Sequence, residues 1–259
     1  MDFRNRTALI TGASGGIGEE FAHQLAGLGA DLVLVARRAD KLEELRATLS
    51  RSTPGIRIDV LAADLSLPGS GAQLAAQVEA LGRKVDVLIN NAGVGSHGEF
   101  VELDPDALAA QIQLNCGTLV DLTARFLPSM VRTGTGLVIN VASTAAFQPT
   151  PTMAVYGATK AFVLSFTEAL WQETKGSGVR VLALCPGATE TEFFARTGKQ
   201  FMTRGRQTSR QVVDTALAAV DKSGPTVISG LANTVLAASA RLLPGRLLAP
   251  VAQRIMKES

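Results

Sequence analysis

Short apolar runs alternate along this chain with longer stretches that have the spacing of amphipathic helices. The short runs are rich in Val, Ile and Leu and do not alternate with polar residues, a pattern typical of strands buried on both faces of a sheet. We expect strands at 7–11, 30–36, 56–63, 85–90, 136–142, 179–185 and 225–229. We expect helices at about 16–28, 39–50, 70–82, 105–132, 156–175 and 209–221.

The order of these elements predicts the fold class. Strand and helix follow one another along the chain, which favours a parallel sheet with right-handed crossovers and helices on both faces. No linker, repeat or low-complexity segment interrupts the order. We therefore expect a single-domain α/β Rossmann fold over residues 1–259, with a doubly wound parallel sheet of about seven strands.

The last stretch, 231–259, departs from the alternation. Pro244 and Gly245 divide it into two apolar helical pieces. Four basic residues lie along it: Arg241, Arg246, Arg254 and Lys257. The favoured interpretation is a tail that packs on the domain or on a second subunit. A helix on a membrane surface, or at the entrance of an apolar substrate site, is the alternative.

Composition and charge narrow the class of protein. Of the 259 residues, 46% are hydrophobic and 19% charged, which excludes a disordered chain. The 25 basic and 23 acidic residues leave a net charge of +2, which gives no reason to expect a nucleic-acid partner. No run of about 18 apolar residues predicts a membrane span.

Cysteines, histidines and the start of the chain bear on location and metals. Cys116 and Cys185 stand far apart in apolar sequence, as expected of buried thiols in a reducing compartment. The two histidines, His23 and His97, cannot build a histidine-rich metal site, and no metal is expected. The first residues lack a cleavable apolar stretch. A cytoplasmic location is therefore predicted.

A glycine-rich loop, "TGASGGIG", joins the first predicted strand to the first predicted helix. Glycines let the backbone turn tightly and approach a pyrophosphate, and the helix N-terminus offers free N–H groups. The spacing differs from the commoner GxGxxG, and a tight strand–helix turn is the alternative. The position favours a dinucleotide site. Its candidate residues are Gly12, Ser14, Gly15, Gly16, Ile17 and Gly18.

The end of the second strand indicates which dinucleotide binds. Sites for NAD usually carry an acidic residue there, which bonds the ribose 2′-hydroxyl. This chain instead has Arg37 and Arg38, and a guanidinium can bind a 2′-phosphate through two hydrogen bonds. We expect NADP(H) to be preferred, with Arg37 as the main ligand and Ser14 assisting. NAD(H) use, with both arginines merely solvated, is the alternative.

Further motifs follow in an order that resembles the classical short-chain dehydrogenases/reductases. They are "TGASGGIG" (11–18), "ADL" (63–65), "NNAG" (90–93), Asn115, Ser143 at the end of "NVAS", "YGATK" (156–160) and "PGATET" (186–191). The resemblance covers nearly the whole sequence. "SGG" in the glycine loop lacks the basic residue that some NADP-dependent members carry there, so Arg37 would have to do most of that work.

The resemblance implies roles for individual residues. Asn115, Ser143, Tyr156 and Lys160 would form a catalytic tetrad. Asp64 would bond the adenine amino group, and Asn90 would help to stabilise the central sheet. The other implied cofactor-binding residues are Leu65, Asn91, Ala92, Gly93, Tyr156, Lys160, Pro186, Gly187, Thr189 and Thr191. The helices at 105–132 and 156–175 would pair between subunits, as a homodimer or homotetramer.

The spacing of Tyr156 and Lys160 suits acid–base chemistry. Residues four apart on a helix face the same way, so we expect the ammonium near the phenol. A free tyrosine has a pKa of about 10, and a nearby positive charge lowers it. Tyr156 would then exchange a proton with a substrate oxygen. Ser143, at a strand's carboxyl end, would stabilise that oxygen, and Asn115, by resemblance, would hold a water that links Lys160 to solvent.

Three variable segments are expected to form the substrate site: 94–100, 143–155 and a lid at 188–209. Their apolar members are Phe100, Ala145, Phe147, Met153, Phe193, Phe194 and Phe201. Such a lining favours an apolar ketone, aldehyde or secondary alcohol. Three lid cations, Lys199, Arg204 and Arg206, would meet an acidic group such as an acyl carrier only in a less favoured alternative.

The sequence thus favours an NADPH-dependent carbonyl reductase. An NAD-linked alcohol or hydroxysteroid-type dehydrogenase remains open, because the same residues serve both directions of the reaction. A non-catalytic dinucleotide-sensing regulator is ranked below both, since Tyr156 and Lys160 are present.

Overall fold

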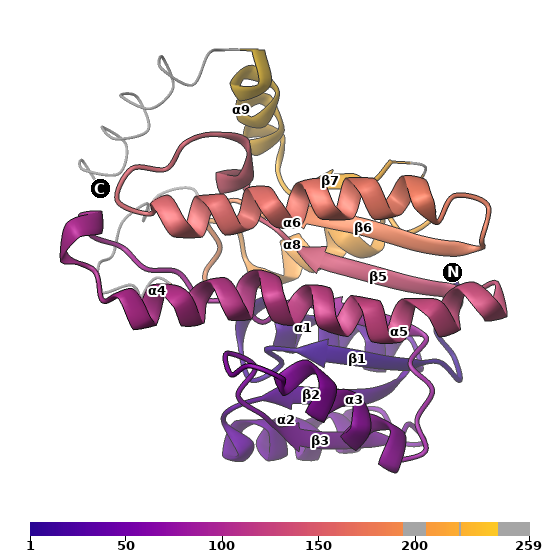
Figure 1. The fold of residues 1–259 in the computed structure, drawn as a ribbon. Coiled ribbons are helices and arrows are strands. Elements are labelled where there is room, and N and C mark those ends of the chain that lie inside the picture. Colours follow the sequence, from indigo (N-terminus) through magenta and orange to yellow (C-terminus); the bar gives the residue numbers. More distant parts are fainter. Residues whose placement is uncertain (194–205, 223, 243–259) are drawn as a thin grey trace.

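The computed structural model describes residues 1–193, 206–222 and 224–242. Within these residues seven parallel strands form one sheet in the order β3-β2-β1-β4-β5-β6-β7 (Figure 1). The strands are β1 Thr7–Thr11, β2 Asp31–Ala36, β3 Ile58–Ala62, β4 Val87–Asn90, β5 Gly136–Val141, β6 Val179–Cys185 and β7 Thr226–Ile228. Each lies inside a predicted strand, which confirms the α/β class and the doubly wound parallel sheet.

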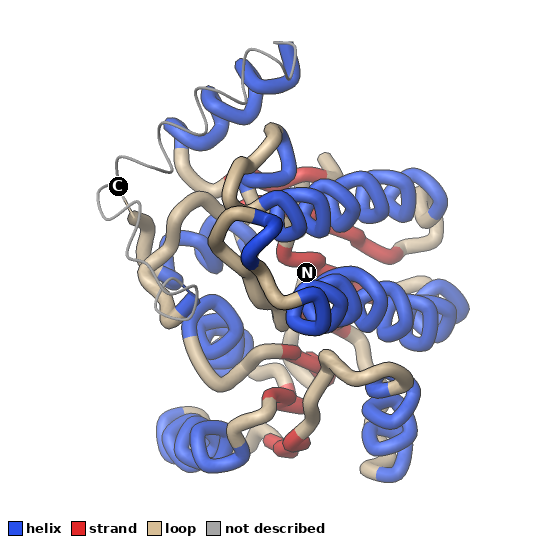
Figure 2. The backbone as a smooth tube through the Cα atoms, turned by 60° about the vertical axis from the view of Figure 1, so that its left-hand side comes forward, coloured by secondary structure: helices blue, strands red, loops and turns tan. Residues whose placement is uncertain are grey.

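Helices cover both faces of the sheet (Figure 2). The described α-helices are α1 Gly16–Gly27, α2 Ala39–Ser52, α3 Ser70–Ala80, α4 Pro105–Ile112, α5 Leu119–Thr133, α6 Ala154–Glu173, α8 Ser209–Leu217 and α9 Leu231–Leu242. Helix α1 packs beside α2 and α8, while α5 packs beside α3 on the other side. Helix α9 is the first of the two predicted tail pieces, and the predicted break at 244–245 lies outside the described residues.

The strand order places the site. The chain builds β1, β2 and β3 outward, then crosses back so that β4 pairs with β1 on its other side. The loops that leave β1 and β4 therefore diverge at the carboxyl edge of the sheet, where open α/β sheets bind their ligands. Gly12 follows β1 and Asn91 follows β4, so both lie at this point.

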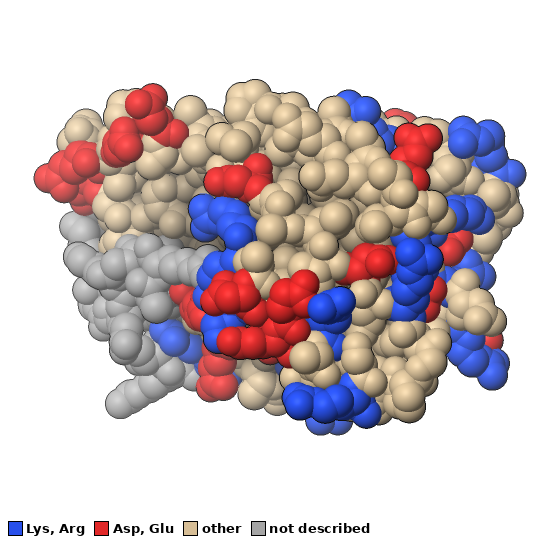
Figure 3. Space-filling view, turned by 90° about the horizontal axis from the view of Figure 1, so that it is seen from below, with Lys and Arg blue, Asp and Glu red and all other residues tan. Residues whose placement is uncertain are grey.

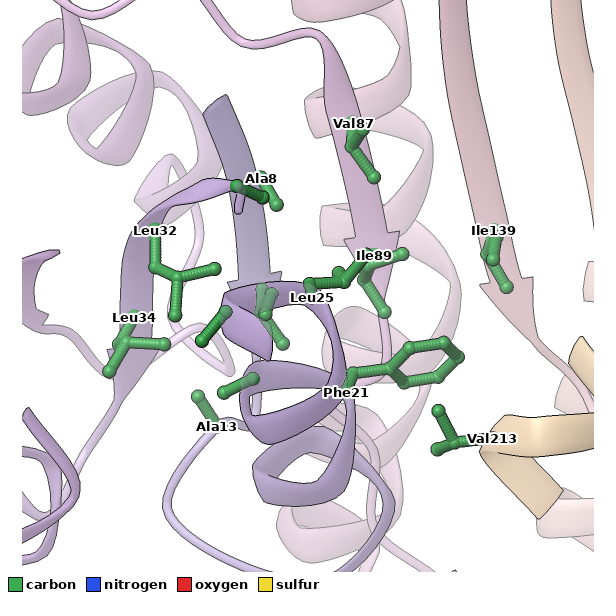
Figure 4. Close-up of a cluster of buried hydrophobic side chains, with 14 of the residues drawn as sticks. Ala8, Ala13, Phe21, Leu25, Leu32, Leu34, Val87, Ile89, Ile139 and Val213 are labelled. Atoms are coloured by element: carbon green, nitrogen blue, oxygen red, sulfur yellow. The ribbon is translucent and has the colours of Figure 1, made fainter. Parts of the chain in front are cut away.

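The core below this edge is apolar and fully buried. Helix α1 presses Phe21 and Leu25 onto the sheet, where they meet Leu34 and Ile89, and Val213 of α8 closes the cluster (Figure 4). Burial of each such side chain contributes about 1.5–3 kcal/mol. This packing fixes the start of α1, and with it the glycine loop, against the strands.

The sequence predicts one helix over 105–132, whereas the structure divides this stretch into three helical segments. Helix α4 ends at Ile112, a π-helical segment η2 (Gln113–Thr118) follows, and α5 begins at Leu119. Asn115 lies in η2, is 1% exposed, and bonds to the loop after β4 and to α6. The Asn115 side chain thus bonds to groups outside its own helix. Short π-helical segments of this kind are frequent at functional sites.

A buried row of polar side chains joins the central strands to the helices. The Asn90 amide nitrogen donates to Thr123 Oγ1 at 3.0 Å and to Asn140 Oδ1 at 2.9 Å. Asn140 in turn donates to Thr167 Oγ1 at 3.0 Å. The row links α5, β4, β5 and α6, which is the sheet-stabilising role implied for Asn90.

The surface shows two further features. Acidic and basic side chains are mixed on the face seen from below in Figure 3, as in the exposed pairs Lys41–Glu44 and Arg46–Glu43 of α2. Helix α9 exposes Leu231 and Val235. In the part of the chain described by the structure, no helix combines the length and apolar character needed to cross a membrane.

Candidate active site

Asn91 fastens the glycine loop to the end of β4. Its side-chain nitrogen donates to Thr11 O at 2.9 Å and to Gly12 O at 3.3 Å. The Thr11 hydroxyl accepts the backbone N–H groups of Asn91 and Ala92, both at 3.0 Å. Gly12 has a φ of 68°, and a Cβ there would lie 2.8 Å from the Asn91 side chain. Only glycine fits this position.

The start of α1 leaves backbone groups available for a ligand. Gly15 is the N-cap residue, and no side chain caps the helix. Gly16 has a φ of 62°, and Gly18 packs directly on Gly12 O. Ile17 packs against the apolar core. Small residues and uncapped N–H groups in one loop fit a dinucleotide diphosphate.

Arg38, and not Arg37, contacts the glycine loop. Arg38 Nη2 donates to Ser14 O at 2.8 Å and to Ser14 Oγ at 3.2 Å, and Arg38 Nε lies 3.4 Å from the same hydroxyl. Arg37 is exposed and lies near Asp64, whose pKa it helps to lower. Arg38 is thus the arginine that contacts Ser14, and the ranking of the two arginines as ligands of a 2′-phosphate stays a prediction.

Asp64 and Leu65 follow β3. The Ser66 hydroxyl and backbone N–H donate to Asp64 Oδ1 at 2.6 and 3.0 Å, and these bonds are the main reason that the pKa of Asp64 is lowered. Leu65 is buried, and its carbonyl accepts from the Thr118 hydroxyl at 2.7 Å. Asp64 thus presents a fixed carboxylate, whereas Leu65 anchors the turn.

The four residues of the implied tetrad converge at the carboxyl end of β5. Ser143 lies just after β5, and its hydroxyl lies near enough to Tyr156 of α6 to lower the pKa of the phenol. Lys160 Nζ lies 5.8 Å from the centre of the Tyr156 ring. A Cβ on Gly93 would lie 3.2 Å from Asn115 Oδ1 and 3.4 Å from Lys160 Nζ, so glycine permits this convergence.

The protonation of Tyr156 differs from the sequence-based expectation. Burial raises the pKa of Tyr156 to about 12, and the hydrogen bond from Ser143 only partly offsets this. The Lys160 ammonium donates to the Val141 carbonyl at 2.7 Å. Burial also lowers the pKa of Lys160 to about 8. In this structure desolvation therefore outweighs the lowering of the Tyr156 pKa that was expected from Lys160.

Asn115 holds three parts of the site together. Its Oδ1 accepts from Val94 N at 3.0 Å, and its side-chain nitrogen donates to Val94 O at 2.9 Å and to Thr159 Oγ1 at 3.0 Å. The Thr159 hydroxyl donates to Tyr156 O at 2.8 Å. The side chain of Asn115 thus positions the start of α6. The water implied at Asn115 stays a prediction.

The segment after β6 is tied to the site and to α9. Pro186 O accepts from Thr144 N at 2.9 Å, next to Ser143. A Cβ on Gly187 would lie 2.7 Å from Asn233 Cγ of α9. Thr189 forms an isolated β-bridge with Gln207. Glu190 N donates to Gln207 O at 2.8 Å, and Gln207 N donates to Ala188 O at 2.9 Å. The bridge closes the base of the predicted lid.

Three consecutive residues of that segment reach three different parts of the site. Thr191 Cγ2 lies 2.8 Å from where a Cβ on Gly16 would be. Glu192 forms an ion pair with Arg38, 3.0 Å between Oε2 and Nη1. The Phe193 ring packs on Tyr156, with centroids 5.2 Å apart. Sequence reasoning missed Glu192. The one signal that could have found it is its position as an acidic residue between Thr191 and Phe193, which were both expected at the site.

The apolar side of the site lies between Tyr156 and the segments expected to bind substrate. Met153 is 3% exposed and clusters with Tyr156, Ala188 and Phe193. The Ala145 N–H donates to Ser143 Oγ at 3.1 Å. Phe147 packs deeper, in the cluster around Val163 and Cys185. Of the remaining expected residues, Phe194, Lys199, Phe201 and Arg204 lie outside the described residues.

Segments 94–100 and 143–155 meet at a small pocket beside α6. The N–H of Gly98 donates to Thr152 O at 2.9 Å, and His97 Nε2 lies 3.2 Å from the Thr152 hydroxyl. The pocket is lined by Ser96, Gly98, Phe100, Leu103, Leu108, Thr152, Ala154 and Val155. The structure therefore brings two of the three expected substrate segments together, within one residue of Tyr156. Across the described ranges, no cluster of His, Cys, Asp and Glu could hold a metal ion.

Comparisons with known proteins agree with this arrangement. A family model described as short chain dehydrogenase matches residues 6–201. A very-long-chain 3-oxoacyl-CoA reductase of Pyrenophora tritici-repentis is 35% identical over 231 residues, which cover 85% of this chain and 65% of that protein. A short-chain dehydrogenase from Sphingobium yanoikuyae, solved in complex with NADPH, has a TM-score of 0.83 at 37% identity and covers 92% of this chain and 93% of its own. A bulky-bulky ketone specific alcohol dehydrogenase from Comamonas testosteroni has a TM-score of 0.78 at 32% identity and covers 92% of each chain.

Proposed function

The chain belongs to the short-chain dehydrogenase family, and on this basis we propose that it is an NADP(H)-dependent oxidoreductase of apolar carbonyls or secondary alcohols. The observation that carries the proposal is the pairing of Tyr156 with Lys160, whose Nζ lies 5.8 Å from the centre of the Tyr156 ring, beside Ser143. This pair lies at the carboxyl edge of the sheet, where the glycine loop also lies.

The residues present fit a nicotinamide dinucleotide. Gly15, Gly16 and Gly18 would admit the diphosphate, Arg38 a 2′-phosphate and Asp64 the adenine. The nicotinamide end would be held by Pro186, Gly187, Thr189 and Thr191. When bound, the cofactor supplies the hydride to the substrate carbon, or accepts it in the reverse direction.

The chain's own residues manage the substrate oxygen. The Ser143 hydroxyl would donate to the carbonyl oxygen and stabilise the charge that develops there. Tyr156 would give its phenolic proton to that oxygen as the alcohol forms, or take it back in reverse. Lys160, 5.8 Å from the Tyr156 ring, would favour the phenolate once the proton has left. Asn115 would act through α6 as a positioning residue.

The preference for NADP(H) rests on Arg38. Its guanidinium donates to Ser14 of the glycine loop, where it can bind a phosphate. An acidic residue in its place would repel a phosphate. The similar structure from Sphingobium yanoikuyae contains NADPH, which supports the same choice for this chain.

An apolar substrate is proposed from the surroundings of Tyr156. Met153, Ala188 and Phe193 pack around its ring, and the adjoining pocket contains Phe100 and Leu103. Such a lining binds apolar groups and leaves the oxygen of the substrate to Ser143 and Tyr156. The similar proteins named for 3-oxoacyl-CoA and for bulky ketones point to the same class.

A second candidate is an NAD-linked alcohol or hydroxysteroid-type dehydrogenase. Glu192 favours this second candidate, because its carboxylate lies beside Arg38 and NAD sites use an acidic residue to bond the ribose. A non-catalytic sensor is disfavoured by the convergence of Ser143, Tyr156 and Lys160.

Assembly and location complete the proposal. Exposed Ile112, Val131 and Phe162 on α4, α5 and α6 support pairing of these helices in a homodimer or homotetramer. The cytoplasm remains the proposed location.

The test is the oxidation of NADPH and, separately, of NADH with a panel of apolar ketones, aldehydes and 3-oxoacyl thioesters. Turnover with NADPH on one substrate class supports the proposal. Faster turnover with NADH favours the second candidate. Tight dinucleotide binding with no turnover on any class, by a preparation that binds cofactor stoichiometrically, contradicts the catalytic assignment.

A further inference from the structure

The Arg38 guanidinium is shared between the glycine loop and the segment after β6. Nη2 donates to Ser14 O at 2.8 Å, and Nη1 lies 3.0 Å from Glu192 Oε2 and 3.3 Å from Glu192 Oε1. The Arg38 side chain is 34% exposed and that of Glu192 57% exposed, so a ligand can reach both. Arg38 is thus the point at which the two segments meet.

The donors of Arg38 are almost all in use. A guanidinium has five N–H groups, and a phosphate is bound best by two of them in parallel. Nε and Nη2 face Ser14, and Nη1 faces Glu192. A 2′-phosphate that engages Arg38 through Nη1 meets the Glu192 carboxylate at the same nitrogen. Two like charges on one donor repel each other, and the carboxylate must leave.

We propose that Glu192 is a specificity-determining residue whose carboxylate competes with the cofactor 2′-phosphate for Arg38. Glu192 then weakens the binding of NADP(H) relative to a chain with a neutral residue at this position. NAD(H), which carries no phosphate there, is not subject to this competition. Glu192 therefore moderates the preference that Arg38 creates. The inference rests on the proposed use of a nicotinamide dinucleotide.

The test measures binding to the full chain by calorimetry, with two fragments of the cofactors. Adenosine 2′,5′-bisphosphate carries the 2′-phosphate, and adenosine 5′-monophosphate does not. In Glu192→Gln we expect the bisphosphate to bind about 2- to 5-fold more tightly, the range typical of losing one exposed ion pair, and the monophosphate to bind as in the wild type. The gain should shrink at high salt.

Two further variants sharpen the test. Glu43→Gln makes the same charge change and also removes one exposed ion pair, on α2 and outside the site, and should leave both affinities unchanged. Arg38→Gln should weaken the bisphosphate, and adding Glu192→Gln to it should bring no gain, because the contested guanidinium is gone. Circular dichroism of each variant confirms the fold.

Several results would overturn the inference. Equal bisphosphate affinity in wild type and Glu192→Gln is one. The same gain in Glu43→Gln, or the same gain for both fragments, is another, since either would indicate a general effect of charge. Failure of every variant to bind NADPH, NADH and both fragments is a different result, because it contradicts the proposed function itself.

Discussion

The ammonium of Lys160 donates to the backbone carbonyl of Val141 at 2.7 Å, at the carboxyl end of β5. Lys160 is 5% exposed, and this bond directs its charge to the strand while the ring of Tyr156 lies 5.8 Å away. Desolvation therefore dominates both residues: it raises the pKa of Tyr156 to about 12 and lowers that of Lys160 to about 8. The resting site is a protonated phenol beside a lysine that titrates near physiological pH.

Tyr156 can be titrated directly, because it is the only tyrosine in the chain. At pH about 10 the urea-unfolded chain should be half ionised by tyrosinate absorbance, whereas the folded chain should still carry the phenol. Phe193→Ala should shift the folded midpoint down, since the ring that packs on Tyr156 is removed. Ser143→Ala should shift it up, since the Ser143 bond lowers this pKa. Coincident folded and unfolded curves would contradict the burial of the phenol.

Tyr156→Phe should separate binding from chemistry. The variant keeps the ring and loses the proton donor, so NADPH affinity should be unchanged while kcat falls by about 10²- to 10⁴-fold. Fluorescence titration gives the affinity, and steady-state rates on the best substrate of the panel give kcat. Turnover at the wild-type rate would remove Tyr156 from the proposed mechanism.

Lys160 should leave a signature in the pH dependence of stability. Its folded pKa of about 8 lies below the ordinary 10.5, so the unfolded state binds more protons between these values. The unfolding free energy of the wild type should therefore rise with pH in that window. Lys160→Met should lack this rise. Because the variant buries no ammonium, we expect it to be more stable than the wild type near pH 8, and urea unfolding at several pH values should show this difference narrowing from about pH 8 to 10. A constant difference would show that Lys160 is not desolvated.

Asn115→Ala should destabilise the protein and slow turnover together. It leaves Val94 N, Val94 O and the Thr159 hydroxyl without their partner, at a cost of about 1–3 kcal/mol in the free energy of unfolding. Urea midpoints and kcat should both fall. Gln113→Ala, in the same π-helical segment but partly exposed, is the matched control and should change stability by less. Equal effects of the two substitutions would deny Asn115 its positioning role.

Gly12→Ala should disrupt the glycine loop. Its φ of 68° disfavours a side chain, and the new Cβ would lie 2.8 Å from the Asn91 side chain. We expect dinucleotide binding to fall by at least about tenfold and stability to fall by more than the strain of about 1–2 kcal/mol alone. Gly82→Ala is the control, because Gly82 has a φ of 66° with nothing within 4 Å of its Cβ position. Similar losses in both variants would leave no role for the contact with Asn91.

Sequence reasoning recovered those features that depend on local pattern. Buried runs such as 136–142 contain their strands because a strand inside a parallel sheet must be apolar on both faces. The break at η2 was not predicted, because over six residues an apolar pattern cannot distinguish a π-helix from an α-helix. Asn115 lies in this segment and bonds to Val94 and Thr159, which are distant in sequence.

Features that depend on distant contacts were missed. Arg38, the N-cap residue of α2, donates to Ser14 O across 24 positions of sequence, a contact that local pattern does not reveal. Glu192 contacts Arg38 although the two residues are 154 positions apart in the sequence. The pKa of Tyr156 follows from packing that includes Phe193 and not from its spacing to Lys160.

The backbone bridge between Thr189 and Gln207 separates the sheet from the segment that it encloses. Two hydrogen bonds fix the points at which the chain leaves and returns: Glu190 N donates to Gln207 O, and Gln207 N donates to Ala188 O. Each doubling of such a loop costs only about 0.6 kcal/mol in closure entropy. The bridge therefore holds the two ends of this segment together, and we expect a change in the length of the segment to leave the sheet in place.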